Sequence, residues 1–367
     1  MIYFDNASTT TSTTSPHSFY NPSSPHSLGI KAERALRDAR AELISFFNSA
    51  ALSSSSALSS APGDVIFTSG GTESNNLAIL GYALTNIRRG STLISAYYEH
   101  PSLLSPIEFA CERQWSKKAS SNSIPPGNVL LSISHVNHET GDINDINNIA
   151  HEAKKINPGA IILVDGVQGF CKEELCLDLI DMYSFSGHKM HGPFGVGGLW
   201  IRKGVNLTPL QHGGGQENAL RSGTENVSGI IQMVEAFEIL NSQFDKNYAL
   251  VANIKKILLG LRDVLQDITI NSLNANTSPY ILNMSFLGVK GETLVHALSE
   301  KGLYASMGAA CRNRKRTKSG LELMGFSPEI AESAIRLSFS PYNTVEEAEQ
   351  ARDIIISEVQ RFRKLKG

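Results

Sequence analysis

One short stretch carries the most information in this 367-residue sequence: Ser184-Phe185-Ser186-Gly187-His188-Lys189. It follows an apolar, strand-like segment, Asp181-Met182-Tyr183, so Lys189 lies among small residues and a histidine near the end of an expected strand. A second apolar run, Ala160-Ile161-Ile162-Leu163-Val164-Asp165, ends in an aspartate. Most lysines are solvated surface charges. Lys189 is informative because Asp165 ends another buried-strand pattern.

The two side chains together fit the cofactor pyridoxal phosphate (PLP). A lysine amine held at a strand end can form a Schiff base with a carbonyl cofactor. PLP works as an electron sink only while its ring nitrogen is protonated, and a carboxylate beside that nitrogen keeps it so. We therefore expect a PLP site built around Lys189 and Asp165.

Strand-like and helix-like segments alternate along residues 30 to 240. This alternation predicts an α/β fold with a mostly parallel sheet that helices cover on both faces. Ser116–Gly127 has loop chemistry throughout, and a long amphipathic pattern from Glu225 to Gln266 leads to a second unit, expected to be a small α+β domain. The strands expected in the first unit are Val65–Thr68, Thr92–Ala96, Val129–Ser134, Ala160–Asp165, Met182–Ser186 and Gly198–Ile201. The second unit is expected to hold strands Thr269–Asn271 and Tyr280–Phe286, and helices Glu292–Glu300 and Thr344–Lys364.

Length and composition suffice for one large and one smaller domain, because 41% of the 367 residues are hydrophobic. We expect residues 16–240 to form the large PLP-binding domain. Residues 1–15 and 241–367 are expected to form the small domain, which carries Cys311. The formal net charge of −2 gives no reason to expect nucleic acid or an anionic membrane as a partner.

The sequence shows no membrane or targeting signal. No segment approaches the roughly 20 consecutive apolar residues of a membrane span. The beginning, Met1 to Asp5, looks like a strand and lacks both a basic region with an apolar core and an Arg-rich amphipathic stretch. We expect a cytoplasmic protein.

The four cysteines are Cys111, Cys171, Cys176 and Cys311. They form no CxxC motif, and we expect neither a disulfide framework nor a metal site. Cys311 differs from the others, because it follows three small residues and precedes the basic run 312–316. Nearby positive charge favours the thiolate. On these local grounds a reactive role and an unreactive one are both open.

The run Ser69-Gly70-Gly71-Thr72 follows a strand and opens a helix. Its glycines let backbone N–H groups approach an anion, and a helix N-terminus favours negative charge. The alternative is a plain strand-to-helix turn with a Ser or Thr cap. Beside Lys189 and Asp165, the cofactor phosphate becomes the natural ligand, and Ser186 and His188 are expected to add donors.

Glu99-His100 closes the strand pattern that starts at Ser91, and a histidine at that edge of a sheet points into the ligand crevice. Its imidazole can stack on the pyridine ring and pass protons. The alternative is a satisfied histidine in a partial core. Gln168 is placed to reach the phenolic oxygen of the cofactor, the alternative being an exposed turn residue.

Two further features have open alternatives. The Gly-rich loop from His212 to Asn226 suits either a phosphate contact across a dimer interface or a flexible hairpin. Arg336 is a charge inside the apolar run Ala334-Ile335-Arg336-Leu337-Ser338. A buried arginine needs a partner, which is either a substrate carboxylate or a structural ion pair.

These residues together resemble the cysteine desulfurases of the NifS/IscS type, within the class V aminotransferase-like PLP enzymes. The resemblance implies fold type I of the PLP-dependent transferases. In that fold a seven-stranded, mostly parallel sheet lies between helices in the large domain, and a small α+β domain follows. The matching segments, in the order of the family, are 3–10, 21–26, 67–76, Glu99-His100, 135–137, Val164-Asp165, 184–189 with Gly192-Pro193, 212–224, 308–311 and Arg336.

The resemblance also implies roles for individual residues. Lys189, His100 and Cys311 are catalytic, as Schiff-base lysine, ring-stacking histidine and sulfur-accepting nucleophile. Asp165 partners the pyridinium, and Arg336 and Asn21 bind the substrate. The remaining cofactor-binding residues are Gln168 and His138 near the phenolic oxygen, and Gly71, Thr72, Ser186, His188 and, from the other subunit of a homodimer, Thr224 at the phosphate.

The implied activity is conversion of L-cysteine to L-alanine with a persulfide left on Cys311 for a sulfur acceptor or iron–sulfur scaffold protein. One departure concerns His138, because the family usually carries a second asparagine there. Another is the stretch between Trp115 and Val129, which looks shortened. Two alternatives accompany the desulfurase. One is a selenocysteine lyase, because the run 307–311 also resembles that branch, and the other is a weakly active regulatory or scaffold paralogue, which His138 and the shortened stretch suggest. A plain aminotransferase would leave Cys311 without a role.

Overall fold

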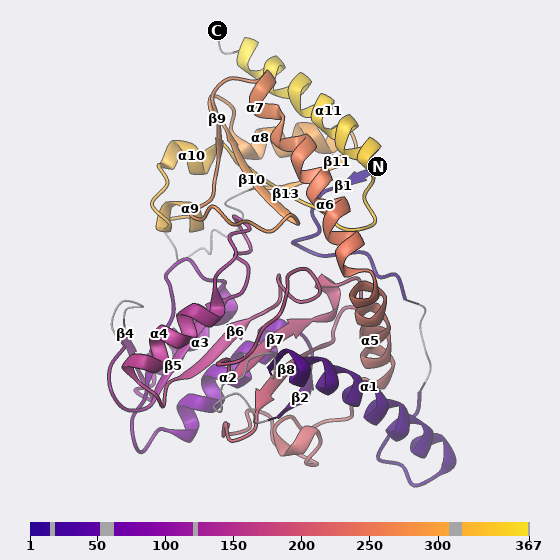
Figure 1. Cartoon of the computed structure of the whole chain (residues 1–367), viewed down its shortest axis with the longest axis vertical. Helices are drawn as coiled ribbons and strands as arrows, with labels where there is room; N and C mark the ends of the chain where they lie inside the picture. Colours follow the sequence, from indigo (N-terminus) through magenta and orange to yellow (C-terminus); the bar gives the residue numbers. More distant parts are fainter. Residues whose placement is uncertain (15–18, 52–61, 120–123, 308–317, 366–367) are drawn as a thin grey trace. The chain divides into compact units, whose positions relative to one another are not determined.

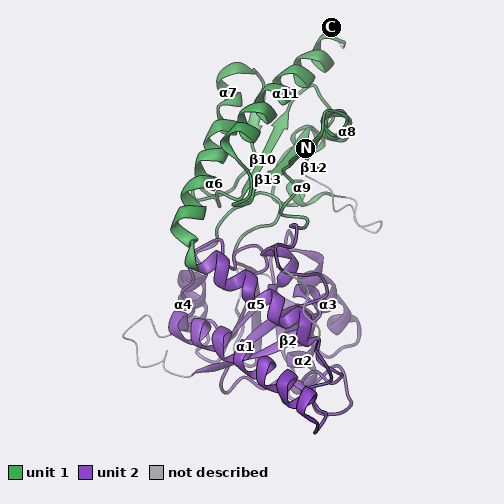
Figure 2. Ribbon diagram, turned by 90° about the vertical axis from the view of Figure 1, so that its right-hand side faces the viewer, with its two compact units in different colours: residues 1–10, 136–143, 242–367 green, residues 11–135, 144–241 purple. Residues whose placement is uncertain are grey.

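The computed structural model describes residues 1–14, 19–51, 62–119, 124–307 and 318–365. The chain packs as two compact units (Figure 2). Unit 1 comprises Met1–Thr10, Val136–Ile143 and Ser242–Gly367, and unit 2 comprises Thr11–His135 and Asn144–Asn241. The first ten residues and residues 136–143 thus pack with unit 1. The domain division expected from the sequence, 16–240 against 1–15 with 241–367, stays a prediction.

Unit 2 contains a seven-stranded sheet in the order β2-β8-β7-β6-β5-β3-β4 (Figure 1). Strand β8 runs antiparallel to both of its neighbours, and the other pairs are parallel, which confirms the mostly parallel sheet. The strands are β2 (Gly63–Thr68), β3 (Thr92–Ile94), β4 (Lys117–Ala119), β5 (Val129–Ser134), β6 (Ile161–Asp165), β7 (Met182–Ser186) and β8 (Gly197–Arg202).

Strand β4 corrects the expectation that Ser116–Gly127 is loop throughout. It pairs in parallel with β3 at the edge of the sheet, with Lys117 opposite Thr92. Lys117 and Lys118 are exposed, as suits an edge strand that must not attract another chain. A short edge strand of two lysines and an alanine has no apolar run, so its sequence gives no strand signal.

Helices cover both faces of this sheet. The side chains of β6 show the division, because Ile162 and Val164 pack in one core cluster and Leu163 packs in the other. Alternate residues of a strand point to opposite faces. The first cluster is shared with α1 (Ser27–Ala51), α4 (Ile146–Ile156) and α5 (Val227–Ser242), and the second with α2 (Gly71–Thr85) and α3 (Pro101–Glu112).

Unit 1 is an α+β unit around a separate hydrophobic core. Its four-stranded antiparallel sheet has the order β12-β13-β10-β9, and β1 pairs in parallel with β11. The expected strands and helices of this part are confirmed as β9, β10, α8 and α11. The strands are β1 (Ile2–Tyr3), β9 (Ile268–Ile270), β10 (Ile281–Phe286), β11 (Leu303–Tyr304), β12 (Ser306–Met307) and β13 (Ala334–Ser338). The helices are α6 (Phe244–Leu259), α7 (Leu261–Val264), α8 (Gly291–Glu300), α9 (Gly320–Leu323), α10 (Pro328–Glu332) and α11 (Val345–Lys364).

Membrane-spanning helices are absent from the described ranges, where every helix is too short or too polar to cross a bilayer.

Candidate active site

Asp165 and Lys189 come from neighbouring strands of unit 2. Strands β6 and β7 are parallel, with Asp165 opposite Ser184, so both strands end at the same edge of the sheet. Asp165 is the last residue of β6. One turn of 3₁₀ helix, η1 (Gly187–Lys189), follows β7 and ends at Lys189. The carboxyl edge of a parallel sheet is where α/β folds bind ligands.

Two nitrogen donors fix the carboxylate of Asp165. Its Oδ2 accepts a hydrogen bond of 2.8 Å from Nδ2 of Asn75, and its Oδ1 accepts one of 3.0 Å from the backbone N–H of Val167. The side chain is buried. Because both oxygens are held, the carboxylate has one orientation at the sheet edge.

The turn before α2 and the end of β7 form a place that fits an anion. The backbone of Gly71 approaches Val167 so closely that a Cβ there would lie 2.3 Å from its Cγ2, and a Cβ on Gly70 would lie 3.4 Å from Oγ of Ser186. That Oγ is buried and has no hydrogen-bond partner among the described residues. A buried hydroxyl without a partner costs about 1–3 kcal/mol. An unpaired hydroxyl beside a helix N-terminus, whose dipole favours negative charge, fits the phosphate of PLP.

Glu73 joins this turn to the Gly-rich loop. Its Oε2 accepts from the backbone N–H of Ser69 at 2.7 Å, and its Oε1 accepts from Nε of Arg221 at 2.9 Å. Burial acts to raise the pKa of Glu73, but the hydrogen bonds from Arg221 and Ser69 outweigh it and hold the pKa below its ordinary value. Arg221 is therefore paired with a carboxylate of its own chain. Thr224 is exposed, and its phosphate contact in a dimer stays a prediction.

His188 and Gln168 lie near the same edge. Burial, reinforced by the positive charges of Lys189 and Lys172, lowers the pKa of His188 to about 4. The imidazole is then neutral at pH 7 and offers one N–H instead of a charge. Gln168 is only 6% exposed, so the alternative of an exposed turn residue is wrong. Thr72 is exposed in the first turn of α2.

His100 is not at the end of a strand, contrary to the sequence analysis. Strand β3 ends at Ile94, and His100 is instead the N-cap of α3. Pro101, at the first position of the helix, has no N–H to lose and a backbone angle suited to helix entry. Nδ1 of His100 accepts from the backbone N–H of Ser102 at 3.1 Å and lies 2.8 Å from its Oγ.

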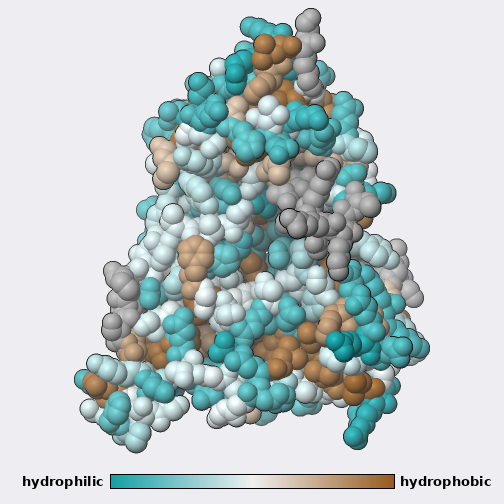
Figure 3. Space-filling view, turned by 180° about the vertical axis from the view of Figure 1, so that it is seen from behind, coloured by the Kyte–Doolittle hydropathy of each residue, from teal (hydrophilic) through white to brown (hydrophobic). Residues whose placement is uncertain are grey.

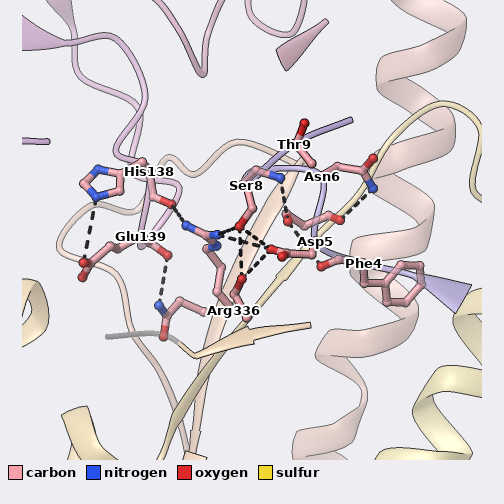
Figure 4. A network of polar contacts seen from close by, with 12 residues as sticks. Phe4, Asp5, Asn6, Ser8, Thr9, His138, Glu139 and Arg336 are labelled. Carbon is pink, nitrogen blue, oxygen red and sulfur yellow. Dashed lines mark hydrogen bonds and ion pairs between the residues drawn. The ribbon is translucent and has the colours of Figure 1, made fainter. Parts of the chain in front are cut away.

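In unit 1, Arg336 lies at the centre of a polar network (Figure 4). Its Nη1 donates to the backbone oxygen of His138 at 2.7 Å, and its Nη2 donates to Oγ of Ser8 at 2.8 Å. Nη2 also lies 3.4 Å from Oδ1 of Asp5, so a structural ion pair is present. Nε is buried and has no hydrogen-bond partner within the described ranges. The guanidinium is thus held in place, and its Nε–H points to no acceptor among the described residues.

Of three further residues expected at the site, two have local contacts, and the third lies outside the described residues. Nε2 of His138 lies 3.9 Å from Oε1 of Glu139, a contact drawn as a dashed line in Figure 4, and the contact of His138 with the cofactor stays a prediction. Asn21 is exposed before α1, and its Oδ1 accepts from the backbone N–H of Ser23 at 2.9 Å. Cys311 lies outside the described residues.

Three residues of this edge were not expected from the sequence, namely Asn75, Ser102 and Glu99. Asn75 is fully buried on the face of α2 that also carries Ile79 and Tyr82. A polar residue in such an apolar stripe needs a buried partner, and this signal is visible in the sequence. The partners themselves are distant in the chain: Asn75 Nδ2 donates to Asp165 and to Oγ of Ser102.

The aminotransferase class-V family model matches residues 2–350. The chain belongs to the class-V aminotransferase family. This membership agrees with the resemblance stated from the motifs, and it covers both units of the structure.

Several named proteins resemble the chain over most of its length. It is 30% identical over 363 residues to a protein named cysteine desulfurase IscS 1 of Archaeoglobus fulgidus, covering 95% of this chain and 91% of that protein. It is 34% identical over 395 residues to a NifS/IcsS protein homolog of Lactobacillus delbrueckii subsp. bulgaricus, covering 100% and 99%. Among solved structures, a NifS-like protein superposes with a TM-score of 0.86 at 30% identity, covering 98% of this chain and 99% of that one.

Proposed function

We propose that the protein is a PLP-dependent cysteine desulfurase. The observation that carries the proposal is the placement of Asp165 and Lys189 at the ends of adjacent parallel strands, beside the hydroxyl of Ser186, which has no hydrogen-bond partner among the described residues. The chain also resembles a protein named cysteine desulfurase over 95% of its length. In the proposed reaction the C–S bond of L-cysteine breaks and an S–S bond forms with Cys311. L-alanine leaves. The thiol of Cys311 loses a proton when the S–S bond forms, and the β-carbon of the product gains one.

PLP, when bound, supplies an electron sink to the carbon atoms next to the substrate nitrogen. Lys189 is the residue assigned to form the Schiff base and to move the α-proton, and Asp165 is assigned to the ring nitrogen. Ser186, His188 and the backbone of the turn at Gly71 are assigned to the phosphate. Since His188 is neutral at pH 7, it contributes a hydrogen bond there instead of a charge.

Arg336 is assigned to the carboxylate of the substrate. The observation behind this is its Nε, which is buried and without a hydrogen-bond partner in the part of the chain that the structure covers. Asp5, Ser8 and the backbone of His138 hold the other end of the guanidinium in a fixed plane. A fixed guanidinium loses little entropy when a carboxylate binds.

We further propose a cytoplasmic homodimer that passes sulfur to an acceptor or iron–sulfur scaffold protein. Large exposed aromatic residues of unit 2 support an interface, namely Tyr20, Tyr97 and Phe194, each at least 60% exposed. Aromatic residues are enriched at protein interfaces. Figure 3 shows hydrophobic residues gathered near the lower edge of the visible face.

The test is alanine release from L-cysteine by the PLP-loaded protein, with Cys311→Ala beside it. We expect the wild type to release alanine and Cys311→Ala to lose at least about a hundredfold of that rate, because no other thiol replaces a positioned nucleophile. Cys111→Ala is the matched control, since Cys111 lies partly exposed on α3. It should retain the rate of the wild type.

Three results would count against the desulfurase. Alanine release that survives in Cys311→Ala would remove the assigned nucleophile. Release from L-selenocysteine with none from L-cysteine would replace the proposal by a selenocysteine lyase. PLP binding without turnover of either amino acid would favour the weakly active paralogue.

A further inference from the structure

A chain of hydrogen bonds within unit 2 connects Asp165 with His100. Nδ2 of Asn75 donates to Oδ2 of Asp165 at 2.8 Å and to Oγ of Ser102 at 2.9 Å. Oγ of Ser102 in turn lies 2.8 Å from Nδ1 of His100. Asn75 is fully buried, and Ser102 and Asp165 are each 6% exposed. Water therefore has little access to these hydrogen bonds, and they keep most of their strength.

The direction of the hydrogen bonds is fixed at the Asp165 end. An ionised carboxylate only accepts, so the side-chain atom of Asn75 that faces it must be the nitrogen. That nitrogen has two hydrogens, and the second points to Oγ of Ser102. Oδ1 of Asn75 is buried without a hydrogen-bond partner among the residues described, and the reverse orientation would set this oxygen against the carboxylate. Asn75 is thus a double donor.

The direction is fixed independently at the His100 end. Nδ1 accepts a hydrogen bond of 3.1 Å from the backbone N–H of Ser102, and a backbone amide cannot reverse its polarity. Because Nδ1 is an acceptor there, the hydroxyl of Ser102 is the donor in the 2.8 Å contact between its Oγ and Nδ1. Nδ1 therefore carries no hydrogen, and in the neutral imidazole the hydrogen is on Nε2.

We propose that Asn75 and Ser102 are positioning residues that set His100 as a hydrogen donor through Nε2. For the reaction, this inference rests on the proposed function. A histidine that presents Nε2–H gives a hydrogen bond or a proton to the reacting molecule. It does not take the α-proton, so that task falls to another group, for which Lys189 is the candidate. Asn75 also links the orientation of Asp165 to that of His100, so the two groups are set by one network.

The experiment is ¹⁵N NMR of the histidine-labelled protein, with and without PLP, at a pH where the imidazole is neutral. The chain has 10 histidines, and His100→Gln identifies the resonances of His100 by their disappearance. We expect a pyridine-type resonance for Nδ1 and a pyrrole-type resonance for Nε2 in both forms. The reverse assignment would overturn the proposal. The form without PLP reports on the network even if no turnover of cysteine is found.

Variants distinguish the loss of this hydrogen-bond network from a general loss of stability. Ser102→Ala should move the Nδ1 resonance toward the value of a weakly hydrogen-bonded nitrogen and lower kcat for L-cysteine by roughly ten- to a hundredfold. Ser102→Thr keeps the hydroxyl and should restore both. Asn75→Ala should act in the same direction as Ser102→Ala. Asn76→Ala is the matched control, because Asn76 is partly exposed on the same helix and its Nδ2 donates to the backbone oxygen of Thr72, one turn earlier.

Two outcomes would contradict the role of the pair. An Nδ1 resonance that is the same in Ser102→Ala and in the wild type would show that the hydroxyl does not bond to His100. Equal loss of activity in Ser102→Thr and Ser102→Ala would assign Ser102 a purely steric role.

Discussion

At the scale of single residues, burial has its clearest chemical effect on Glu99. Its carboxyl is 3% exposed, and Oε1 accepts from the backbone N–H of Ser134 at 3.0 Å. Burial raises the pKa of Glu99 to about 7, the charge of Asp165 adds to this, and the hydrogen bond from Ser134 only partly offsets it. The group beside His100 thus changes charge near neutral pH.

Replacing Glu99 by Gln should remove this titration. A carboxyl whose pKa is raised on folding stabilises the folded state below its unfolded pKa of about 4.5 and loses that contribution as the pH rises to about 7. The free energy of unfolding of Glu99→Gln relative to the wild type should therefore increase by about 1.4 kcal/mol per pH unit between these values. Urea unfolding of the PLP-free proteins at several pH values measures it. A difference that stays constant over this range would refute the assignment.

The contacts of Arg336 bear on the two partners that were open for its charge. The sequence leaves a substrate carboxylate and a structural ion pair open. The structure contains the ion pair with Asp5, but at 3.4 Å and to one nitrogen only. A bidentate pair would have used two donors. Its Nε has no hydrogen-bond partner within the described part of the chain, and for this reason binding of a substrate carboxylate by Arg336 stays a proposal.

At the scale of elements, the turn η2 (Glu217–Ala219) of the Gly-rich loop is strained. Glu217, Asn218 and Ala219 have φ of 50°, 55° and 60°, in the left-handed region. Tertiary bonds hold it there: Glu217 accepts from Arg40 at 2.6 and 2.8 Å and from the backbone N–H of Phe67 at 2.7 Å. A flexible hairpin, the alternative for this loop, does not fit these buried bonds.

Ala219→Gly should relieve part of the strain. A left-handed conformation costs an L-residue about 1–2 kcal/mol, and glycine adopts it freely, so the free energy of unfolding should rise by about 1 kcal/mol. Ala35→Gly in α1 is the control, because glycine in a helix should lower the stability by about 1 kcal/mol. Thermal and urea unfolding of both variants measure the effects. A loss of stability in Ala219→Gly would contradict the strained turn.

At the scale of the whole molecule, the chain forms unit 1 from three separate segments. Phe4, from the first segment, is fully buried in the core of unit 1 and packs edge-on against Phe339, with ring centroids 5.0 Å apart. The first ten residues therefore complete a core whose other members are more than two hundred residues away in sequence.

Phe4→Ala should lower the free energy of unfolding by about 3–5 kcal/mol, because it removes a buried ring and leaves a cavity. Ile156→Ala is the control. Its side chain is 65% exposed at the end of α4, and the change should stay within about 0.5 kcal/mol. Chemical unfolding followed by circular dichroism gives both values. A cost for Phe4→Ala no larger than that for Ile156→Ala would show that the segment is dispensable to the core.

The sequence by itself determined the elements that have a local signal. Buried strands such as β6 and β7 appear as apolar runs, and Lys189 and Asp165 are placed by where those runs end. Family motifs added the assigned cofactor and reaction. The position expected for His100 was wrong by one element. In the sequence, Ser95 to Glu99 resemble a continuation of the strand, whereas in the structure the strand ends at Ile94 and a helix begins at Pro101.

The tertiary structure alone decided which polar groups meet. Asn75 and Asp165 are 90 residues apart, and Arg336 and Asp5 are 331 apart, yet each pair is in contact. Helical and strand periodicities extend over a few residues, so they place a side chain on a face but do not choose its partner. The partner follows from how whole elements pack and from the cost of leaving a buried polar group unpaired. For this reason the motifs predicted the assigned residues, whereas the network that orients His100 became visible only in the folded chain.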